Sequence, residues 1–333
     1  MKPPSNETPI RRIDAQNFSL AEVGVGDTAQ VERLFARCFG APPGPGWHRW
    51  KCDTLGGKAL GLWNEAGDLV AHYAGFPRSL LWQGKPLAAI QIGDVMVAPE
   101  ARVSLTPRGA FFQVSTRFVA DHVGSDRDFM LAFGFPNERA MRLGVRLKTY
   151  DNRGHIQQLA WPARAGKLSL GWRWSPLAAD EIAPHVDAAW QAMAAGMANH
   201  VLGVRDAAYV IGRFVRRPDR QYRFFRLSRR LTGRTAAVAI MRLEPGCAEL
   251  IDVIGPRQAL RWIALAAASE AAVCGAEFLT CWASESAAAA WGEYGAQNKG
   301  TAAFFVVDRP SVIPLDKLAA AQWWWMGGDT DFL

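Results

Sequence analysis

Cysteine is scarce in this sequence: the 333 residues include only five, and no two of them form a CxxC pair. This scattered set excludes a disulfide framework and a zinc site built on paired cysteines. The six histidines are equally dispersed, without a pair at the spacing of a helical metal site. We therefore predict a protein of a reducing compartment with no metal ligands. The cysteines are Cys38, Cys52, Cys247, Cys274 and Cys281.

Long apolar runs are also missing, since no stretch of 18 residues is apolar and free of charge. We therefore predict no membrane-spanning helix. The opening segment, MKPPSNETPIRRIDAQ, has no apolar core and does not look like a secretory signal. We predict a disordered tail at residues 1–16 and a cytoplasmic location.

Positive charge is in excess, with a formal net charge of +7, and much of it lies in two segments, 142–153 and 215–234. Basic residues interleaved with aromatic ones are compatible with nucleic-acid binding. The same alternation in QYRFFRLSRR is typical of a half-buried strand, which is the interpretation we favour. Nucleic acid is therefore not the expected partner, whereas a basic surface suits an anionic cofactor or substrate.

Two similar segments lie in the two halves of the chain. AAIQIGDVMVAP (88–99) and CAELIDVIGP (247–256) both carry Asp-Val in an apolar run that closes on proline, which aligns Asp94 with Asp252. Each is followed by a helical pattern, a buried strand and the start of another helix. The alternative is a chance likeness, because the shared words are short. The following segments are 109–123, 128–135 and 136–144 in the first half and 257–273, 276–283 and 284–295 in the second.

Further strand and helix signals precede each central strand. Turn residues divide the upstream segments into short antiparallel strands. Each half therefore indicates an α+β unit with one βαβ-like crossover. We predict an α/β (α+β) protein of two units, at 17–165 and 166–333, each a mixed, mostly antiparallel sheet flanked by helices. The upstream strands are expected within 58–87 and 221–246, and the helices at 28–39, 47–53, 180–197 and 205–216.

The segment VMVAPEAR (95–102) leads into a loop with arginines and prolines, and FGFPNERAMRLG (133–144) runs from a strand into a helix. Both resemble the Gcn5-related N-acetyltransferase (GNAT) family of acyl-CoA-dependent acyltransferases, in which a V-x-P-x-x-R sequence often precedes the pyrophosphate loop. The resemblance covers roughly residues 20–160 and is weaker over 177–333, where it depends partly on the repeat. Tandem units of this kind occur among related bacterial acyltransferases, including ones linked to cell-envelope chemistry.

The resemblance implies acetyl-CoA or another acyl-CoA, bound where the fourth strand meets a helix N-terminus. Backbone N–H groups there attract a pyrophosphate, and strand amides pair with pantetheine. The loop departs from the family's Gly-rich turn, because VSLTP intervenes and only Gly109 remains. Either PRGAF still cradles the phosphate or the cofactor site is impaired. The second copy lacks a Gly-rich turn altogether, so we predict at most one acyl-CoA site in the chain. The implied cofactor-binding residues are Val95, Met96, Val97, Arg102, Arg108, Gly109, Ala110 and Asn137.

The resemblance also implies a general base on the fourth strand and a tyrosine as general acid. Asp94 is the only acidic residue of that strand and is the candidate base, although its repeat in the second copy favours a structural role. Because the fourth helix has no tyrosine, Tyr73 becomes the candidate acid, with plain strand packing as the alternative. Asn137 and Glu138 also suit helix capping. The implied substrate-binding residues are His72, Phe133 and Glu138.

We therefore predict an acyl-CoA-dependent N-acyltransferase that transfers acetyl or another acyl group to an amine of a small molecule or sugar. A catalytically inactive tandem GNAT-like binding protein stays open, because the loop is long and poor in glycine. An aminoacyl-tRNA-dependent transferase also stays open, because basic clusters occur in the second half. The three tryptophans of AQWWWMGGDTDFL (321–333) cannot all face one side of a strand, which indicates core packing, with sugar stacking as the alternative.

Overall fold

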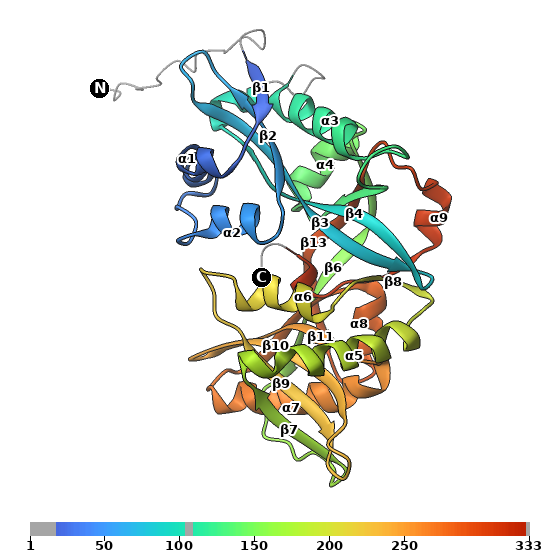
Figure 1. The fold of residues 1–333 in the computed structure, drawn as a ribbon. Coiled ribbons are helices and arrows are strands. Elements are labelled where there is room, and N and C mark those ends of the chain that lie inside the picture. The colour runs from blue at the N-terminus through green and yellow to red at the C-terminus, as the bar shows by residue number, and fades with distance from the viewer. Residues whose placement is uncertain (1–17, 104–108, 331–333) are drawn as a thin grey trace, which may run out of the picture.

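The computed structural model describes residues 18–103 and 109–330, apart from the side chain of Val103. The tail predicted at residues 1–16 lies outside these ranges, as does Arg108 of the predicted cofactor loop. The first half of the chain gathers at one end of the molecule and most of the second half at the other (Figure 1). Within the described part, no helix is long and apolar enough to cross a membrane.

The first half combines paired antiparallel strands with helices. Helix α1 (Thr28–Phe39) buries Val31 and Leu34 and ends at Gly40, whose φ of 84° is a left-handed conformation that glycine adopts without steric cost. The remaining elements are α2 (Trp47–Asp53), α3 (Ala110–His122), α4 (Glu138–Arg146), β1 (Ser19–Glu22), β2 (Lys58–Trp63), β3 (Leu69–Trp82), β4 (Lys85–Val97), β5 (Leu131–Gly134) and β6 (Tyr150–Pro162), with 3-10 helices at Val25–Asp27 and Pro99–Val103.

The second half repeats this mixture. Helix α6 (Ala207–Val210) begins at Asp206, whose carboxylate accepts a hydrogen bond from the Tyr209 amide, and it continues as a π-helix at Ile211–Val215. The other helices are α5 (Ile182–Gly196), α7 (Leu260–Val273), α8 (Glu285–Gly292) and α9 (Leu315–Ala320), with 3-10 helices at Ala179–Glu181, Arg257–Ala259 and Gly327–Asp329. The strands are β7 (Trp172–Leu177), β8 (His200–Gly203), β9 (Arg223–Arg229), β10 (Thr235–Glu244), β11 (Cys247–Ile254), β12 (Phe278–Ser284), β13 (Gln297–Asp308) and β14 (Gln322–Trp324).

One continuous, mostly antiparallel sheet runs through both halves, in the order β1-β2-β3-β4-β5-β13-β6-β12-β11-β10-β9-β7. Its two ends follow the same plan: the parallel pair β4–β5 in the first half corresponds to the parallel pair β11–β12 in the second. Helices flank the sheet, as Figure 1 shows. The mixed sheet predicted from the sequence is therefore the observed fold class.

The two halves exchange their last long strands. Strand β13 belongs to the second half by sequence but pairs with β5 of the first, where Val306 lies opposite Gly134. Strand β6 belongs to the first half but pairs with β12 of the second, where Trp161 lies opposite Leu279. Strands β6 and β13 also pair with each other at the centre of the sheet. Each half therefore completes its sheet with a strand from the other half.

The sheet of the first half has two differently covered faces. Helices α3 and α4 lie on one side of β3 and β4, and α1 and α2 lie on the other (Figure 1). Ile90 of β4 packs with Phe118 of α3, whereas the neighbouring Gln91 lies near Lys51 of α2. This follows from the alternation of side chains along a strand. The two faces of this sheet therefore carry different side chains at neighbouring positions.

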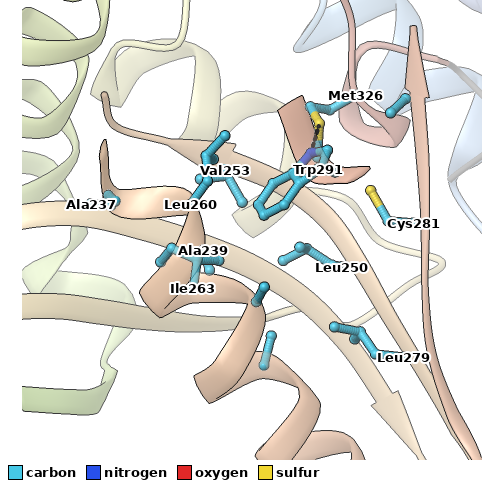
Figure 2. Close-up of a cluster of buried hydrophobic side chains, with 14 of the residues drawn as sticks. Ala237, Ala239, Leu250, Val253, Leu260, Ile263, Leu279, Cys281, Trp291 and Met326 are labelled. Carbon is cyan, nitrogen blue, oxygen red and sulfur yellow. Dashed lines mark hydrogen bonds between the residues drawn. The ribbon is translucent and has the colours of Figure 1, made fainter. Parts of the chain in front are cut away.

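The C-terminal residues fill the core of the second half. Figure 2 shows Met326 against Trp291 of α8, whose indole nitrogen donates a hydrogen bond to the Met326 sulfur at 3.4 Å. Trp324 packs in the same core, whereas Trp323 and Trp325 stack on each other in the neighbouring one, with ring centroids 5.6 Å apart. All three tryptophans are buried, which places them in the core rather than in a sugar-binding surface.

Candidate functional site

A bulge interrupts β4 at Asp94. His72 of β3 pairs with Met96 and Ala74 pairs with Gly93, so two residues of β4 stand opposite one of β3. The bulged Asp94 has a φ of 51°, a left-handed conformation that aspartate tolerates better than most residues. The parallel pairing of β4 with β5 ends two residues earlier, at Ile92. Beyond the bulge, no strand within the described ranges pairs with β4 on the side of β5, and we call this the open edge of β4.

The open edge offers backbone donors to a ligand. The Ala98 amide donates to the Val70 carbonyl at 2.8 Å, on the side of β3. Because N–H directions alternate along a strand, the amides of Val97 and Val95 point to the opposite side. The Val97 carbonyl accepts hydrogen bonds from the Arg102 Nε at 2.8 Å and from the Cys38 thiol at 3.3 Å. An extended ligand with amide groups can pair with such an edge.

Helix α3 begins close to this edge in sequence. Gly109 is its N-cap and Ala110 its first residue, and both are buried. The N-cap residue, a glycine, provides no side-chain hydrogen bond to the first amides of α3, and the helix dipole favours an anion at this end. The strand, loop and helix order predicted for a cofactor site is present, although the loop at residues 104–108 lies outside the described ranges.

The Asp94 side chain lies on the face covered by α2. Its carboxylate accepts a hydrogen bond from Lys51 Nζ at 2.6 Å, and the two side chains are only 8% and 3% exposed. The Lys51 ammonium also lies over the rings of Trp47 and Phe76, 4.5 and 4.8 Å from their centroids. The candidate base is thus held in a buried ion pair, whose lysine was not among the predicted site residues.

His72 fixes the backbone of the bulge. Its Nδ1 donates to the Asp94 carbonyl at 2.8 Å, while its Nε2 has no hydrogen-bond partner in the described part of the chain. Burial lowers the pKa of His72 to about 4, so the ring is neutral at neutral pH. His72 therefore lies beside the candidate base, and its predicted role in substrate binding stays a prediction.

The opposite face carries a buried cluster of hydroxyl and carboxyl groups. The Tyr73 hydroxyl donates to Asp308, a residue of the exchanged strand β13, and Tyr150 of β6 lies beside them. Burial raises the pKa of Asp308 to about 7 and raises the pKa of both tyrosines. This cluster can hold and donate a proton within the sheet. Asp308 was missed because it comes from the other half of the sequence.

Glycine at position 144 makes room for this cluster. A Cβ added there would lie 2.1 Å from the Tyr150 ring, so helix α4 needs a glycine where the ring packs. Phe111 of α3 contacts both tyrosine rings, with centroids 5.9 Å from Tyr150 and 6.4 Å from Tyr73. Helix α4 has no tyrosine, and the ring of Tyr150, which follows this helix in the sequence, packs against it at Gly144.

Three other predicted residues lie away from the bulge. Phe133 is fully buried and stacks on Trp325 with centroids 5.1 Å apart, which is the environment of a core residue. Asn137 caps α4, because its side chain accepts a hydrogen bond from the Ala140 amide at 2.9 Å. Glu138 is exposed and pairs with Arg142 one turn further along α4. The Met96 side chain is buried in the core, so only its backbone is near the open edge.

A pocket of about 150 Å³ opens on the α2 face, between α2 and the π-helix of the second half. Lys51 lines it, and the same side chain contacts Asp94 at the bulge. The pocket is therefore next to the candidate base, on the side away from the tyrosine cluster. Other lining residues include Phe76, Arg78, Gln91, Tyr209 and Arg213.

The corresponding gap in the second half is filled by the chain itself. Strand β11 also has a register shift, beside Asp252, and its pairing with β12 ends at Leu250. Here Met326 bridges to Ala283, and the Ser284 amide donates to the Trp325 carbonyl at 2.9 Å. The C-terminal segment thus occupies the edge that is open in the first half. Asp252 is bound by Arg205 and has a structural role.

The comparisons with known proteins agree with this geometry. The acetyltransferase (GNAT) domain family matches residues 21–140. No curated protein sequence matches the chain. The region matched covers the bulge, the open edge, the start of α3 and the cap of α4.

Several solved structures share the fold. A probable N-acyltransferase from Enterococcus faecalis aligns with a TM-score of 0.66 and 11% identity, over 88% of this chain and 72% of that one. A GCN5-related N-acetyltransferase from Anabaena variabilis gives 0.65 and 15%, over 87% and 72%. The N-myristoyltransferase of Saccharomyces cerevisiae with bound myristoyl-CoA gives 0.59 and 11%, over 88% and 82%. At such low identities, these similarities establish the fold alone.

The family match includes both the strand that bulges at Asp94 and the helix that begins after Gly109. The structural neighbours extend the likeness to most of the chain. Residues 21–140 therefore match the acetyltransferase (GNAT) domain family, and most of the chain shares the fold of these structures.

Proposed function

We propose that this protein is an acyl-CoA-dependent N-acyltransferase that transfers acetyl or another acyl group to the amine of a small molecule. The observation that carries the proposal is the edge of β4 beyond the Asp94 bulge, with the N-terminus of α3, capped by a glycine without a side chain, following it in the chain. A donor with amide groups and a pyrophosphate suits these two features, since strand amides pair with amides and helix N-termini attract anions.

The residues proposed to hold the acyl-CoA lie along this edge. The amides of Val95 and Val97 would pair with the pantetheine, and the first amides of α3, at Gly109 and Ala110, would contact the pyrophosphate. Arg102 is exposed near the same strand and would attract the anionic pyrophosphate. We propose the same role for Arg108. When bound, the cosubstrate supplies a thioester, whose C–S bond breaks as the amine forms its C–N bond.

The two faces of the sheet suit the two proton transfers of this reaction. On the α2 face, Asp94 would accept the proton that the amine loses. On the other face, Tyr73, hydrogen-bonded to Asp308, would donate a proton towards the leaving sulfur. His72 would keep the Asp94 backbone in place through its Nδ1 hydrogen bond.

We assign the acyl-CoA site to the N-terminal unit, residues 17–165. The C-terminal unit, residues 166–333, would be a degenerate copy that supports the first, because its own end fills the equivalent gap. A tandem binding protein without catalysis is the second candidate, since the Asp94 carboxylate is engaged by Lys51.

Calorimetric titration with acetyl-CoA tests the donor site. We expect micromolar binding by the wild-type protein and none by Gly109→Trp, because the indole would cover the start of α3. The matched control is Gly171→Trp, at a glycine of the second half with open space around it, which should bind as the wild type does. The proposal fails if the wild-type protein does not bind acetyl-CoA at millimolar concentration.

Asp94→Asn separates the catalytic candidate from the binding one. Asparagine tolerates the left-handed backbone at this position but is a far weaker proton acceptor. We expect acyl transfer to an amine, followed by release of the CoA thiol, to fall by about 100-fold or more. The affinity for acetyl-CoA should stay unchanged by calorimetry. Full turnover in this variant would assign Asp94 a structural role only.

A further inference from the structure

The pocket on the α2 face is built by both halves of the chain. Its walls come from α2 and from α6 with its π-helix, which face each other across the junction in Figure 1. Its base comes from β3 and β4, through Phe76 and Gln91. The volume of about 150 Å³ exceeds the roughly 30 Å³ share of one water several-fold, so a small organic molecule fits.

The lining is cationic. Lys51, Arg78 and Arg213 contribute to it, and no aspartate or glutamate is among the described residues that line it. Two of these cations are held in place by contacts within the protein. Arg78 bonds Asp329 at 2.9 Å and lies 3.6 Å from the centroid of the Tyr209 ring. Arg213 donates to the Thr330 carbonyl, which also fixes its position. Little side-chain entropy is then lost when a ligand binds.

Unsatisfied polar groups also point to a ligand. The Gln91 side chain is only 7% exposed, lines the pocket and makes no hydrogen bond within residues 18–103 and 109–330. The Nε of Arg78 is likewise buried without a hydrogen-bond partner among the described residues. Buried polar groups normally have partners, because leaving them unpaired costs free energy. A ligand oxygen in the pocket would accept a hydrogen bond from the Gln91 amide.

The pocket also leads to the candidate base. Lys51 lines the pocket and hydrogen-bonds Asp94 at 2.6 Å, and Gln91 lies on the same strand as Asp94, three residues earlier. A ligand anchored by a negative group among the arginines can therefore extend its other end towards the bulge. This end is where an acceptor amine would have to be for acyl transfer.

We propose that this pocket binds the acceptor through a carboxylate, so that the acceptors are small amines of the amino-acid class. This inference rests on the proposed transferase function and adds the chemical class of its second substrate. The carboxylate would accept hydrogen bonds from the guanidinium of Arg213 and the amide of Gln91. Charge-assisted hydrogen bonds of this kind are stronger than neutral ones and discriminate against an uncharged analogue.

The experiment compares two probes that differ only in this group, 4-aminobutyrate and 4-aminobutanamide. We expect the wild-type protein to bind the acid about 10- to 100-fold more tightly than the amide in calorimetry, the range of one to two charge-assisted hydrogen bonds. In Gln91→Glu the introduced carboxylate should abolish this preference, and in Arg213→Met the preference should shrink. Arg229→Met, an exposed arginine of β9, is the matched control and should keep it. Melting curves check that each variant is folded.

Equal binding of acid and amide by the wild-type protein would overturn the inference, as would the absence of binding by either probe at millimolar concentration. An unchanged preference in both folded pocket variants would do the same. The acetyl-CoA titration is independent of these results. If acetyl-CoA binds and the preference is absent, only the acceptor class is wrong. If the preference holds and acetyl-CoA does not bind, the transferase function is wrong and the pocket remains a carboxylate site.

Discussion

Replacing Arg205 by methionine should lower the free energy of unfolding by about 3–5 kcal/mol, the cost of leaving buried charges without their partner. The Arg205 side chain is fully buried, bonds both oxygens of Asp252 at 3.0 Å and also bonds Asp329. Asp329 in turn accepts from Arg78 of β3 at 2.9 Å. This network ties the C-terminal turn to both halves, so its loss should affect the whole molecule.

Denaturant unfolding followed by tryptophan fluorescence measures this change. The matched control is Arg117→Met, which breaks an arginine–aspartate pair on the surface of α3, where the arginine is 61% exposed. Exposed pairs of this kind contribute little, so this variant should lose about 0.5 kcal/mol or less. Similar losses in the two variants would mean that the buried network does not stabilise the protein more than a surface pair does.

Asp308→Asn should reduce the dependence of stability on pH. Burial raises the pKa of Asp308 from 3.8 to about 7, so the folded protein binds a proton that the unfolded chain has released. This stability is fully present below the unfolded pKa and is lost as the pH rises through about 7. The wild-type protein should therefore lose on the order of 3 kcal/mol from this group between about pH 5 and pH 8.

Asparagine has the shape of the protonated acid and can still accept the hydrogen bond from Tyr73. The variant should thus be more stable than the wild type above about pH 7, with a flatter curve from about pH 5 to 8 in denaturant titrations. Some slope should remain at the acidic end, because burial also raises the pKa of Asp252 to about 6. Asp128→Asn, at an exposed carboxylate, should leave the curve unchanged. A wild-type slope in Asp308→Asn would mean that Asp308 is ionised in the folded protein.

Local patterns in the sequence were enough to predict much of the fold. The helices expected at 28–39 and 47–53 are α1 and α2, and the helix expected at 180–197 corresponds to α5. The repeat that aligned Asp94 with Asp252 marks two register shifts at equivalent places in the sheet. These features depend on periodicity and on short segments, which a sequence displays directly.

Contacts between segments that are far apart in the sequence could not be predicted from such local patterns. Nothing local in QNKGTAAFFVVD indicates that it completes the sheet of the other half. The partners of two predicted residues were missed for the same reason: Tyr73 bonds Asp308, and Asp94 bonds Lys51, which lies in the helix expected at 47–53. The predicted roles in cofactor binding stay predictions, because contacts with an acyl-CoA cannot be derived from the sequence of the protein. They concern Val95, Val97, Arg102 and Gly109.

The strand exchange between the halves also constrains how this protein is made. Strand β5 ends at Gly134 and its neighbour β13 begins only at Gln297, so β5 leaves the ribosome well before β13. Until then, one edge of β5 has unpaired backbone groups, which can pair with other chains. Closing so long a loop costs entropy before any contact is gained, and this slows folding. The sheet of the first half therefore cannot be completed before β13 has been made, and until then we expect the nascent first half to be open to aggregation.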